Sequence, residues 1–124
     1  MRLFKNKWFV RFATAEDIDD ATLCKAIESA EKGLIDADLG GGIIKLRIAR
    51  EGEGVSGGFR SIVVYRRGKR AFFVFGFAKK RTANIKTDEL RAFRKLAREM
   101  LALNDRQIQE MKKTMALTEV TCNG

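Results

Sequence analysis

The sequence predicts a small α+β domain, in which an antiparallel β-meander of three strands has helices packed on one face and further helices at the C-terminal end. Two observations lead to this fold class. Apolar and polar residues alternate in the middle of the chain, as they do in strands with one buried face, and apolar residues recur at helical spacing on either side. With 124 residues and no linker-like segment, residues 1–124 are expected to form a single domain.

The N-terminal part is predicted to be mostly helical. Trp8 and the phenylalanine four residues later suit a short helix after a brief first strand. A second helix is expected over residues 20–32, with Asp19 or Asp20 as its N-cap. Gly33 then suits a left-handed C-cap.

Three consecutive strands are predicted over residues 43–49, 59–66 and 70–77. In the first, isoleucine and leucine alternate with Lys45 and Arg47, so the two basic side chains share one face. The third strand is apolar on both faces after its first residue, which is typical of a central strand.

Glycine and polar residues mark the connections. Residues 36–42 are predicted to be a turn-rich loop, residues 50–58 a glycine-rich hairpin loop, and residues 67–69 a tight turn. None of the glycine runs is followed by Lys-Ser or Lys-Thr, so a Walker-type phosphate loop is not expected.

Two C-terminal helices follow the meander. The first is expected to begin at a Thr87 cap, with two acidic residues near the positive end of its dipole. The second is capped by Asn104 or Asp105, and residues 118–124 suit a short strand or a frayed tail.

The positive charge of the chain is concentrated in its middle. The net charge is +9, and residues 45–94 alone carry fourteen basic and four acidic side chains. A concentrated charge predicts an anionic partner such as nucleic acid, an acidic protein or a membrane surface. The alternative is a solvated basic face without a ligand.

Composition excludes several classes of site. The chain has no histidine, which removes Ser-His-Asp and Cys-His nucleophiles and histidine-based zinc sites. Cys24 and Cys122 are far apart without a CxxC pair, so neither a disulfide framework nor a metal cluster is expected. We therefore expect no metal and no cofactor. Apolar runs shorter than ten residues and the lack of a signal-peptide pattern predict a cytoplasmic protein without a membrane segment.

A basic sheet face suggests RNA binding, and it also suits RNA cleavage. Attack by a ribose 2′-OH needs a base, a cation for the phosphorane and a proton donor for the 5′-oxygen. Without histidine, a lysine with a lowered pKa can serve as the base and arginines can stabilise the phosphate. Lys45 and Arg47, with Arg60 and Arg66 beside them if the strands pair across the hairpin, form the candidate cluster. Solvated strand residues are the alternative.

Three sequence blocks, residues 41–47, 57–65 and 73–79, resemble the RelE/ParE superfamily of bacterial type II toxins, in particular its HigB-like RelE members. The blocks are a glycine-then-basic strand, a Gly-Gly-x-Arg strand ending in tyrosine, and an apolar strand ending in lysine. The resemblance covers roughly residues 1–103 and leaves a terminal helix and tail, residues 104–124, outside it.

This resemblance implies a toxin that inhibits translation by cleaving mRNA, often in the ribosomal A site. The implied partners are mRNA, the ribosome and a cognate antitoxin, typically a helix-turn-helix protein encoded nearby, with operator DNA reached only through that antitoxin.

The resemblance also assigns residues by position. The catalytic candidates are Lys45 and Arg47 in the basic strand, Arg60 as the contact to the scissile phosphate, and Lys79 at the end of the last meander strand. The expected RNA-binding residues are Arg50, Arg66, Lys80 and Arg81. Some members use a tyrosine or histidine near the C-terminus, but the only tyrosine here is Tyr65, which we expect to pack rather than to react.

Two alternatives remain at this stage. A ParE-like protein would share the fold and inhibit DNA gyrase without cleaving RNA, although the basic sheet face argues against it. An inactivated family member would serve only as antitoxin partner or corepressor.

Overall fold

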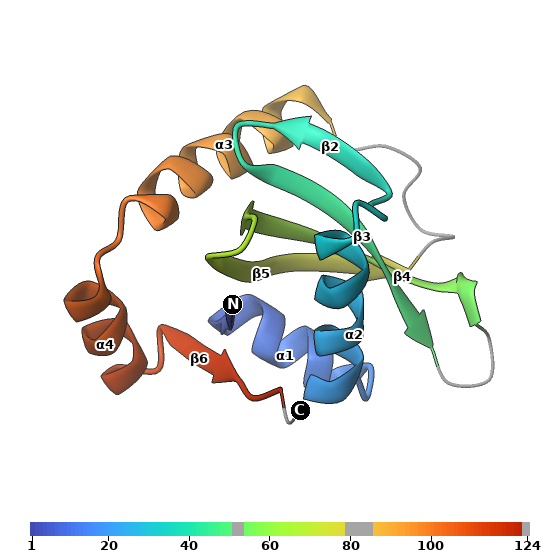
Figure 1. Cartoon of the computed structure of the whole chain (residues 1–124), viewed down its shortest axis with the longest axis horizontal. Helices are drawn as coiled ribbons and strands as arrows, with labels where there is room; N and C mark the ends of the chain where they lie inside the picture. Colours follow the sequence, from blue (N-terminus) through green and yellow to red (C-terminus); the bar gives the residue numbers. More distant parts are fainter. Residues whose placement is uncertain (51–53, 79–85, 123–124) are drawn as a thin grey trace.

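The computed structural model describes residues 1–50, 54–78 and 86–122 and shows one sheet between two pairs of helices (Figure 1). In chain order the elements are β1 (Arg2–Asn6), α1 (Lys7–Ala15), α2 (Asp20–Glu31), β2 (Ala37–Gly40), β3 (Ile43–Arg50), β4 (Gly54–Arg66), β5 (Arg70–Ala78), α3 (Thr87–Leu101), α4 (Asp105–Lys113) and β6 (Leu117–Val120).

The six strands found in the described residues form a mixed sheet in the order β2-β3-β4-β5-β1-β6. Strands β3, β4 and β5 pair antiparallel, which confirms the predicted meander. Strand β1 lies parallel to β5, and β6 pairs antiparallel with β1. The first and last strands of the chain therefore extend the meander on the side opposite to β2.

The predicted α+β fold is confirmed, but the helices cover both faces of the sheet rather than one. The first core joins α1 and α2 to the face of Ile44, Leu46 and Val63. The second joins α3 and α4 to the opposite face, where Ile43 and Val64 are fully buried. The physical reason is that β5 is apolar on both faces, and such a strand needs cover on both.

Several boundaries of strands and helices in the structure differ from the predicted ones. Strand β2 lies within the segment predicted as a loop, and β4 begins at Gly54, inside the predicted hairpin loop. Gly40, Gly41 and Gly42 all have positive φ, so they form the turn that folds β2 back onto β3. The cap before α3 is Lys86 rather than Thr87, whereas Asp19, Gly33 and Asn104 behave as predicted.

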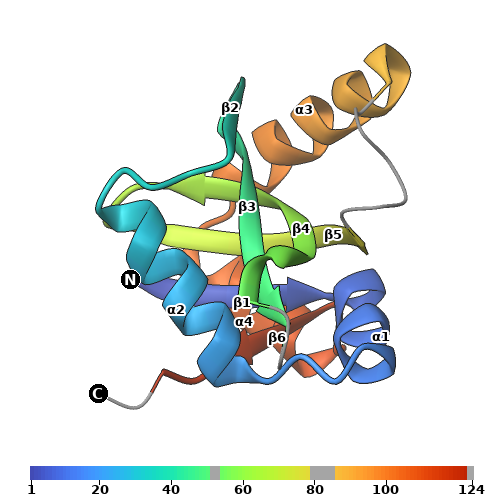
Figure 2. The same cartoon turned by 90° about the vertical axis from the view of Figure 1, so that its right-hand side faces the viewer.

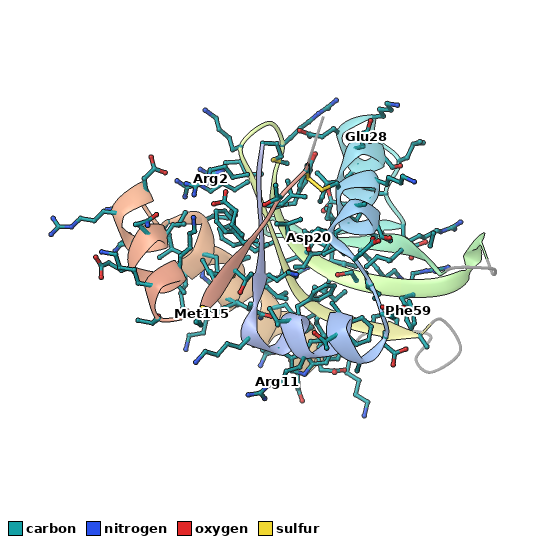
Figure 3. All side chains as sticks on the ribbon, turned by 90° about the horizontal axis from the view of Figure 1, so that it is seen from below. Arg2, Arg11, Asp20, Glu28, Phe59 and Met115 are labelled. Atoms are coloured by element: carbon teal, nitrogen blue, oxygen red, sulfur yellow. A yellow bond between two sulfur atoms is a disulfide. The ribbon has the colours of Figure 1, made fainter. Side chains whose placement is uncertain are left out.

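Contrary to the sequence-based expectation, Cys24 and Cys122 form a disulfide. It joins α2 to the residues that follow β6, and Figure 3 shows it beside the end of the chain. The two cysteines are 98 residues apart, so their spacing carried no signal. They meet because β6 pairs with β1, which carries the tail past α2.

Removing this disulfide is expected to lower the free energy of unfolding by about 3 kcal/mol, because it closes a long loop in the unfolded chain. Urea unfolding of Cys24→Ala against the oxidised wild type measures the difference. Reduced wild type should match the variant, and adding Cys122→Ala should change nothing more. Equal midpoints for the oxidised wild type and Cys24→Ala would contradict the crosslink.

Hydrogen bonds to one carboxylate also hold β6 in place. The Glu119 carboxylate accepts hydrogen bonds from Arg2 Nε at 2.9 Å and from Lys112 Nζ at 2.8 Å, so it connects β6 to β1 and α4. The hydrogen bonds from Arg2 outweigh the effect of burial and, together with Lys112, lower the pKa of Glu119 to about 2. The same contact raises the pKa of Arg2.

Because the pKa of Glu119 is depressed in the folded state, its stabilising effect is complete above the unfolded pKa of about 4.3 and is lost as the pH falls toward 2. We expect Glu119→Gln to be less stable than wild type at pH 7 and the difference to shrink between about pH 5 and 2. Thermal unfolding across this range measures it. Glu110→Gln, at an exposed carboxylate 3.8 Å from Lys113, is the control and should show little difference at any pH.

Candidate functional site

The pairing of β3 with β4 brings three predicted cations together on one face. Arg47 lies directly opposite Arg60, and Lys45, two residues before Arg47, lies opposite Ile62. Because side chains two residues apart share a face, all three point to the same side of the sheet. The juxtaposition expected for Lys45, Arg47 and Arg60 is therefore present; we call these three residues the cationic trio.

An acidic residue that the sequence analysis missed lies within the cationic trio. The Asp36 carboxylate is 2.9 Å from Arg47 Nε, 3.2 Å from Lys45 Nζ and 3.5 Å from Arg60 Nε. Two strands thus supply the cations, and the residue before a third supplies the anion that all of them share.

Strand β2 positions Asp36. The Asp36 backbone N–H donates to the Lys45 carbonyl oxygen at 2.8 Å, immediately before β2 begins. Arg94 of α3 donates to the Leu39 carbonyl oxygen at 2.6 Å, which fixes β2 from the helix side. Asp36 falls in the segment predicted as a loop, so the sequence offered no signal that would place it beside Arg47.

The ionised form of Asp36 is favoured. Burial alone would raise the pKa of Asp36, but hydrogen bonds from Arg47 and Lys45 and the charges of Lys45 and Arg60 more than offset it, so the pKa lies below its usual range. One carboxylate against three cations leaves a local charge of +2, which an incoming anion can still neutralise.

The three cations differ in how far they reach solvent. The exposed fraction of the side chain is 53% for Arg47, 21% for Lys45 and 8% for Arg60. Arg60 also donates from Nη1 to the Phe59 carbonyl oxygen at 3.3 Å. Arg47 is thus the member that can meet a ligand, while Arg60 lies behind it and adds charge.

The other predicted site residues are not placed beside the cationic trio. Arg66 is exposed but pairs with Arg70 at the far end of β4, six residues from Arg60 and roughly 20 Å away at the rise of a strand. The expectation that it lies beside the trio was wrong, because the buried Ile62 and Val64 lie between. The side chain of Arg50, and all of Lys79, Lys80 and Arg81, fall outside the described residues.

Tyr65 points to the opposite face of the sheet, where it packs against the first core. Its hydroxyl donates to Glu31. Burial and the Glu31 carboxylate raise the pKa of Tyr65 to about 12, so the phenol keeps its proton at neutral pH. Phe77 of β5, which lies opposite Arg60 of β4, is buried.

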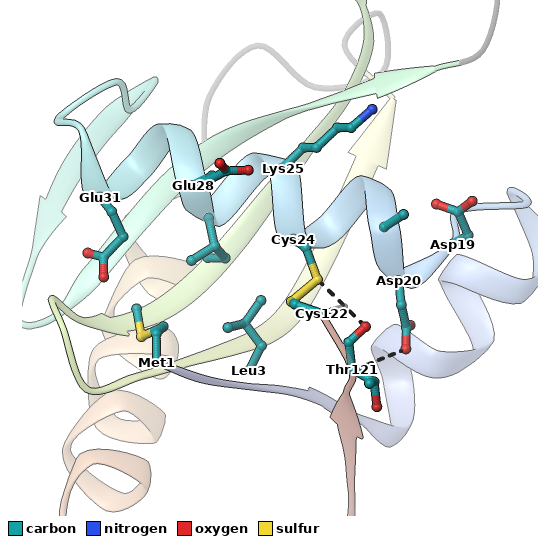
Figure 4. Close-up of a pocket in the computed structure, with 12 residues that line it drawn as sticks. Met1, Leu3, Asp19, Asp20, Cys24, Lys25, Glu28, Glu31, Thr121 and Cys122 are labelled. Carbon is teal, nitrogen blue, oxygen red and sulfur yellow. Dashed lines mark hydrogen bonds between the residues drawn. A yellow bond between two sulfur atoms is a disulfide. The ribbon is translucent and has the colours of Figure 1, made fainter. Parts of the chain in front are cut away.

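A cavity of about 860 Å³ lies away from the trio, between α2, the start of β1 and the residues after β6 (Figure 4). Leu3, Ile27 and the disulfide provide apolar walls, and acidic residues such as Glu28 and Glu31 line it too. Carboxylates repel phosphate, so the trio is the better place for an anionic ligand. Among the described residues no group of acidic or cysteine side chains could hold a metal ion.

Comparison with known protein families gives a match. The family model described as RelE toxin of RelE / RelB toxin-antitoxin system matches residues 1–120. This range includes α4 and β6, beyond residue 103 where the recognised resemblance ended. No curated protein matches the chain. In the described part of the chain, no helix is long and apolar enough to cross a membrane.

Replacing the shared carboxylate tests the site. Asp36→Asn should lower the free energy of unfolding by about 1–2 kcal/mol at pH 7, because charge-assisted hydrogen bonds are lost. The pKa of Asp36 is depressed in the folded state, so the deficit should begin to shrink as the pH falls below about 4. Denaturant unfolding at pH 7 and pH 3 measures it. Asp38→Asn, on the exposed side of β2, is the matched control, and equal losses in the two variants would contradict the assignment.

Proposed function

Because this chain belongs to the RelE toxin family of RelE/RelB toxin–antitoxin systems, we propose that it is a HigB-like toxin that cleaves mRNA on the ribosome and so inhibits translation. Family membership implies a cognate RelB-type antitoxin. Our proposal adds that this antitoxin is a helix-turn-helix protein encoded nearby, which carries the toxin to operator DNA, and that the toxin acts in the cytoplasm.

The observation that carries the proposal is the cationic trio arranged around one carboxylate. Arg47 uses Nε for Asp36, at 2.9 Å, so its two Nη groups remain for a phosphate. A guanidinium held in this way presents paired N–H donors, which match two phosphate oxygens. The bond to Asp36 therefore orients the group that receives the substrate.

Cleavage by the neighbouring ribose fits these residues. The 2′-oxygen attacks phosphorus while a base takes its proton, the P–O5′ bond breaks, and the 5′-oxygen gains a proton. The products are a 2′,3′-cyclic phosphate and a 5′-hydroxyl. Negative charge develops on the phosphate oxygens during this step, and Arg47 and Arg60 stabilise it.

Lys45 takes a different role in this scheme. Its Nζ lies 3.2 Å from the Asp36 carboxylate, which holds the side chain on the face of the trio, where it donates hydrogen bonds to the substrate. Lys79 as a fourth catalytic residue rests on the resemblance alone, and Arg50, Lys80 and Arg81 as RNA contacts remain predictions from the sequence. Arg66 is no longer part of the proposed RNA surface, because it lies at the other end of β4.

Arg47→Ala tests the proposal. Induction of the wild type without its antitoxin should arrest growth and give site-specific 5′ ends in translated mRNA by primer extension. Arg47→Ala should reduce cleavage about 100-fold, the usual effect of losing one donor to a transition-state oxyanion. Arg66→Ala, which removes an exposed arginine from the same sheet, is the control and should cleave as the wild type does.

Three outcomes would contradict parts of the proposal. DNA damage without new mRNA ends would indicate a gyrase inhibitor of the ParE type. Growth arrest that survives combined substitution of Lys45, Arg47 and Arg60 would show that the site is elsewhere. Lack of toxicity on induction would indicate an inactive member that serves only as the partner of the antitoxin.

A further inference from the structure

Trp8 is a large aromatic residue left partly in solvent. It is the only tryptophan in the chain, and 41% of its surface is exposed. It lies in the first turn of α1, where the Asn6 side chain accepts from the Phe9 backbone N–H at 2.8 Å and caps the helix. Among the described residues, the other large exposed apolar side chains are not aromatic; they are Met1, Leu34 and Met115.

Two phenylalanine rings pack against the Trp8 ring. Its centroid lies 4.4 Å from that of Phe75 and 5.4 Å from that of Phe12. Phe75 in turn contacts Phe93 of α3 at 5.6 Å. These contacts hold the indole in position while part of its surface stays in solvent, so little side-chain freedom would be lost when a ligand stacks on it.

The sheet register connects this aromatic group to the cationic trio. Phe75 of β5 lies opposite Ile62 of β4, which lies opposite Lys45 of β3. Residues that pair across strands share a face, so Phe75 and Lys45 point to the same side of the sheet. Two interstrand steps separate their backbones by about 10 Å.

The end of β1 explains how Trp8 reaches this place. The pairing of β1 with β5 ends at Lys5 and Phe73, and the Asn6 side chain then donates to the Val74 carbonyl oxygen at 3.2 Å. Helix α1 begins there and takes the place of a strand beside the last part of β5. Figure 2 shows the end of β5 between α1 and α3.

We propose that Trp8, backed by Phe75, is a stacking site for a nucleobase of the single-stranded RNA whose phosphate binds at Lys45 and Arg47. The inference rests on the proposed function and adds the subsite that holds a base. Cations for phosphates next to an aromatic surface for bases are the two elements that proteins use to bind single-stranded nucleic acid. Stacking on an indole is tolerant of sequence, because every base has a π-face.

The lone tryptophan makes the test direct, because every change in indole fluorescence reports on Trp8. The probe is a hexameric oligoadenylate at low salt, compared with a hexamer of the same ribose-phosphate backbone without bases. The oligoadenylate should quench the fluorescence of the full-length protein in a saturable way. The abasic hexamer should bind through its phosphates, as seen by anisotropy of an attached label, and should leave the indole fluorescence nearly unchanged.

Variants give a second readout that does not depend on fluorescence of the protein. Trp8→Ala should weaken binding of labelled oligoadenylate roughly 5- to 100-fold, the range for losing one stacked base, and should leave the affinity for the abasic hexamer unchanged. Trp8→Phe should restore most of the loss. Leu34→Ala and Met115→Ala, which remove exposed apolar side chains elsewhere, are the matched controls and should bind as the wild type does.

The outcomes separate this inference from the proposed function. RNA binding and cleavage that depend on Arg47 but not on Trp8, with no quenching, would overturn the stacking site and leave the nuclease proposal standing. If the oligoadenylate does not bind and induction of the toxin also leaves translated mRNA uncut, both proposals are overturned. Equal loss of oligoadenylate and abasic binding in Trp8→Ala would indicate damage to the fold and would also overturn the stacking site.

Discussion

Two arginines lie directly opposite each other on neighbouring strands, and the candidate site depends on the carboxylate that makes this possible. Like charges in a cross-strand pair destabilise a sheet. The Asp36 carboxylate offsets the repulsion between Arg47 and Arg60 because it forms an ion pair with each of them. It forms a third ion pair with Lys45. Its place is fixed by β2, a four-residue edge strand that the glycine turn folds onto β3 and that Arg94 holds from α3. A short strand at the edge therefore sets the geometry of the site.

Because helices pack on both faces of the sheet, the site can lie only where a face is left open to solvent. Along β4, Ile62 and Val64 are buried under the second core, while Arg60, on the same face, ends among charged groups. Along β3 and β4 this face is thus divided into a packed half and a polar half. Side chains of the polar half are attached to strands whose neighbouring residues are fixed by packing, which is the arrangement that holds functional groups in place. Arg66 has the same parity but lies past the packed half, so it cannot share the site.

Local patterns in the sequence predicted the meander, the faces of its strands and three of the four helix caps, because these depend on residues close in the chain. The juxtaposition of Lys45, Arg47 and Arg60 also followed, since a hairpin fixes it. Asp36 was missed because its role depends on an edge strand too short to show alternation. The helices on the second face and the pairing of Cys24 with Cys122 depend on contacts between distant segments. The apolar character of both faces of β5 was the one local sign that two layers of helices were needed.

The chemistry of the trio bears on where the proposed cleavage takes place. Arginine cannot give up its proton in a protein, so Arg47 and Arg60 supply charge and orientation and transfer no proton. The chain has no histidine, and the phenol of Tyr65 lies on the opposite face with its proton firmly held. A site of this kind lowers the barrier mainly by stabilising the phosphorane and by holding the reacting groups in line. Free mRNA is flexible and would have to be ordered by the toxin alone. An mRNA that a ribosome already holds in place would need less ordering by the trio, which supports the ribosome-dependent form of the proposed activity.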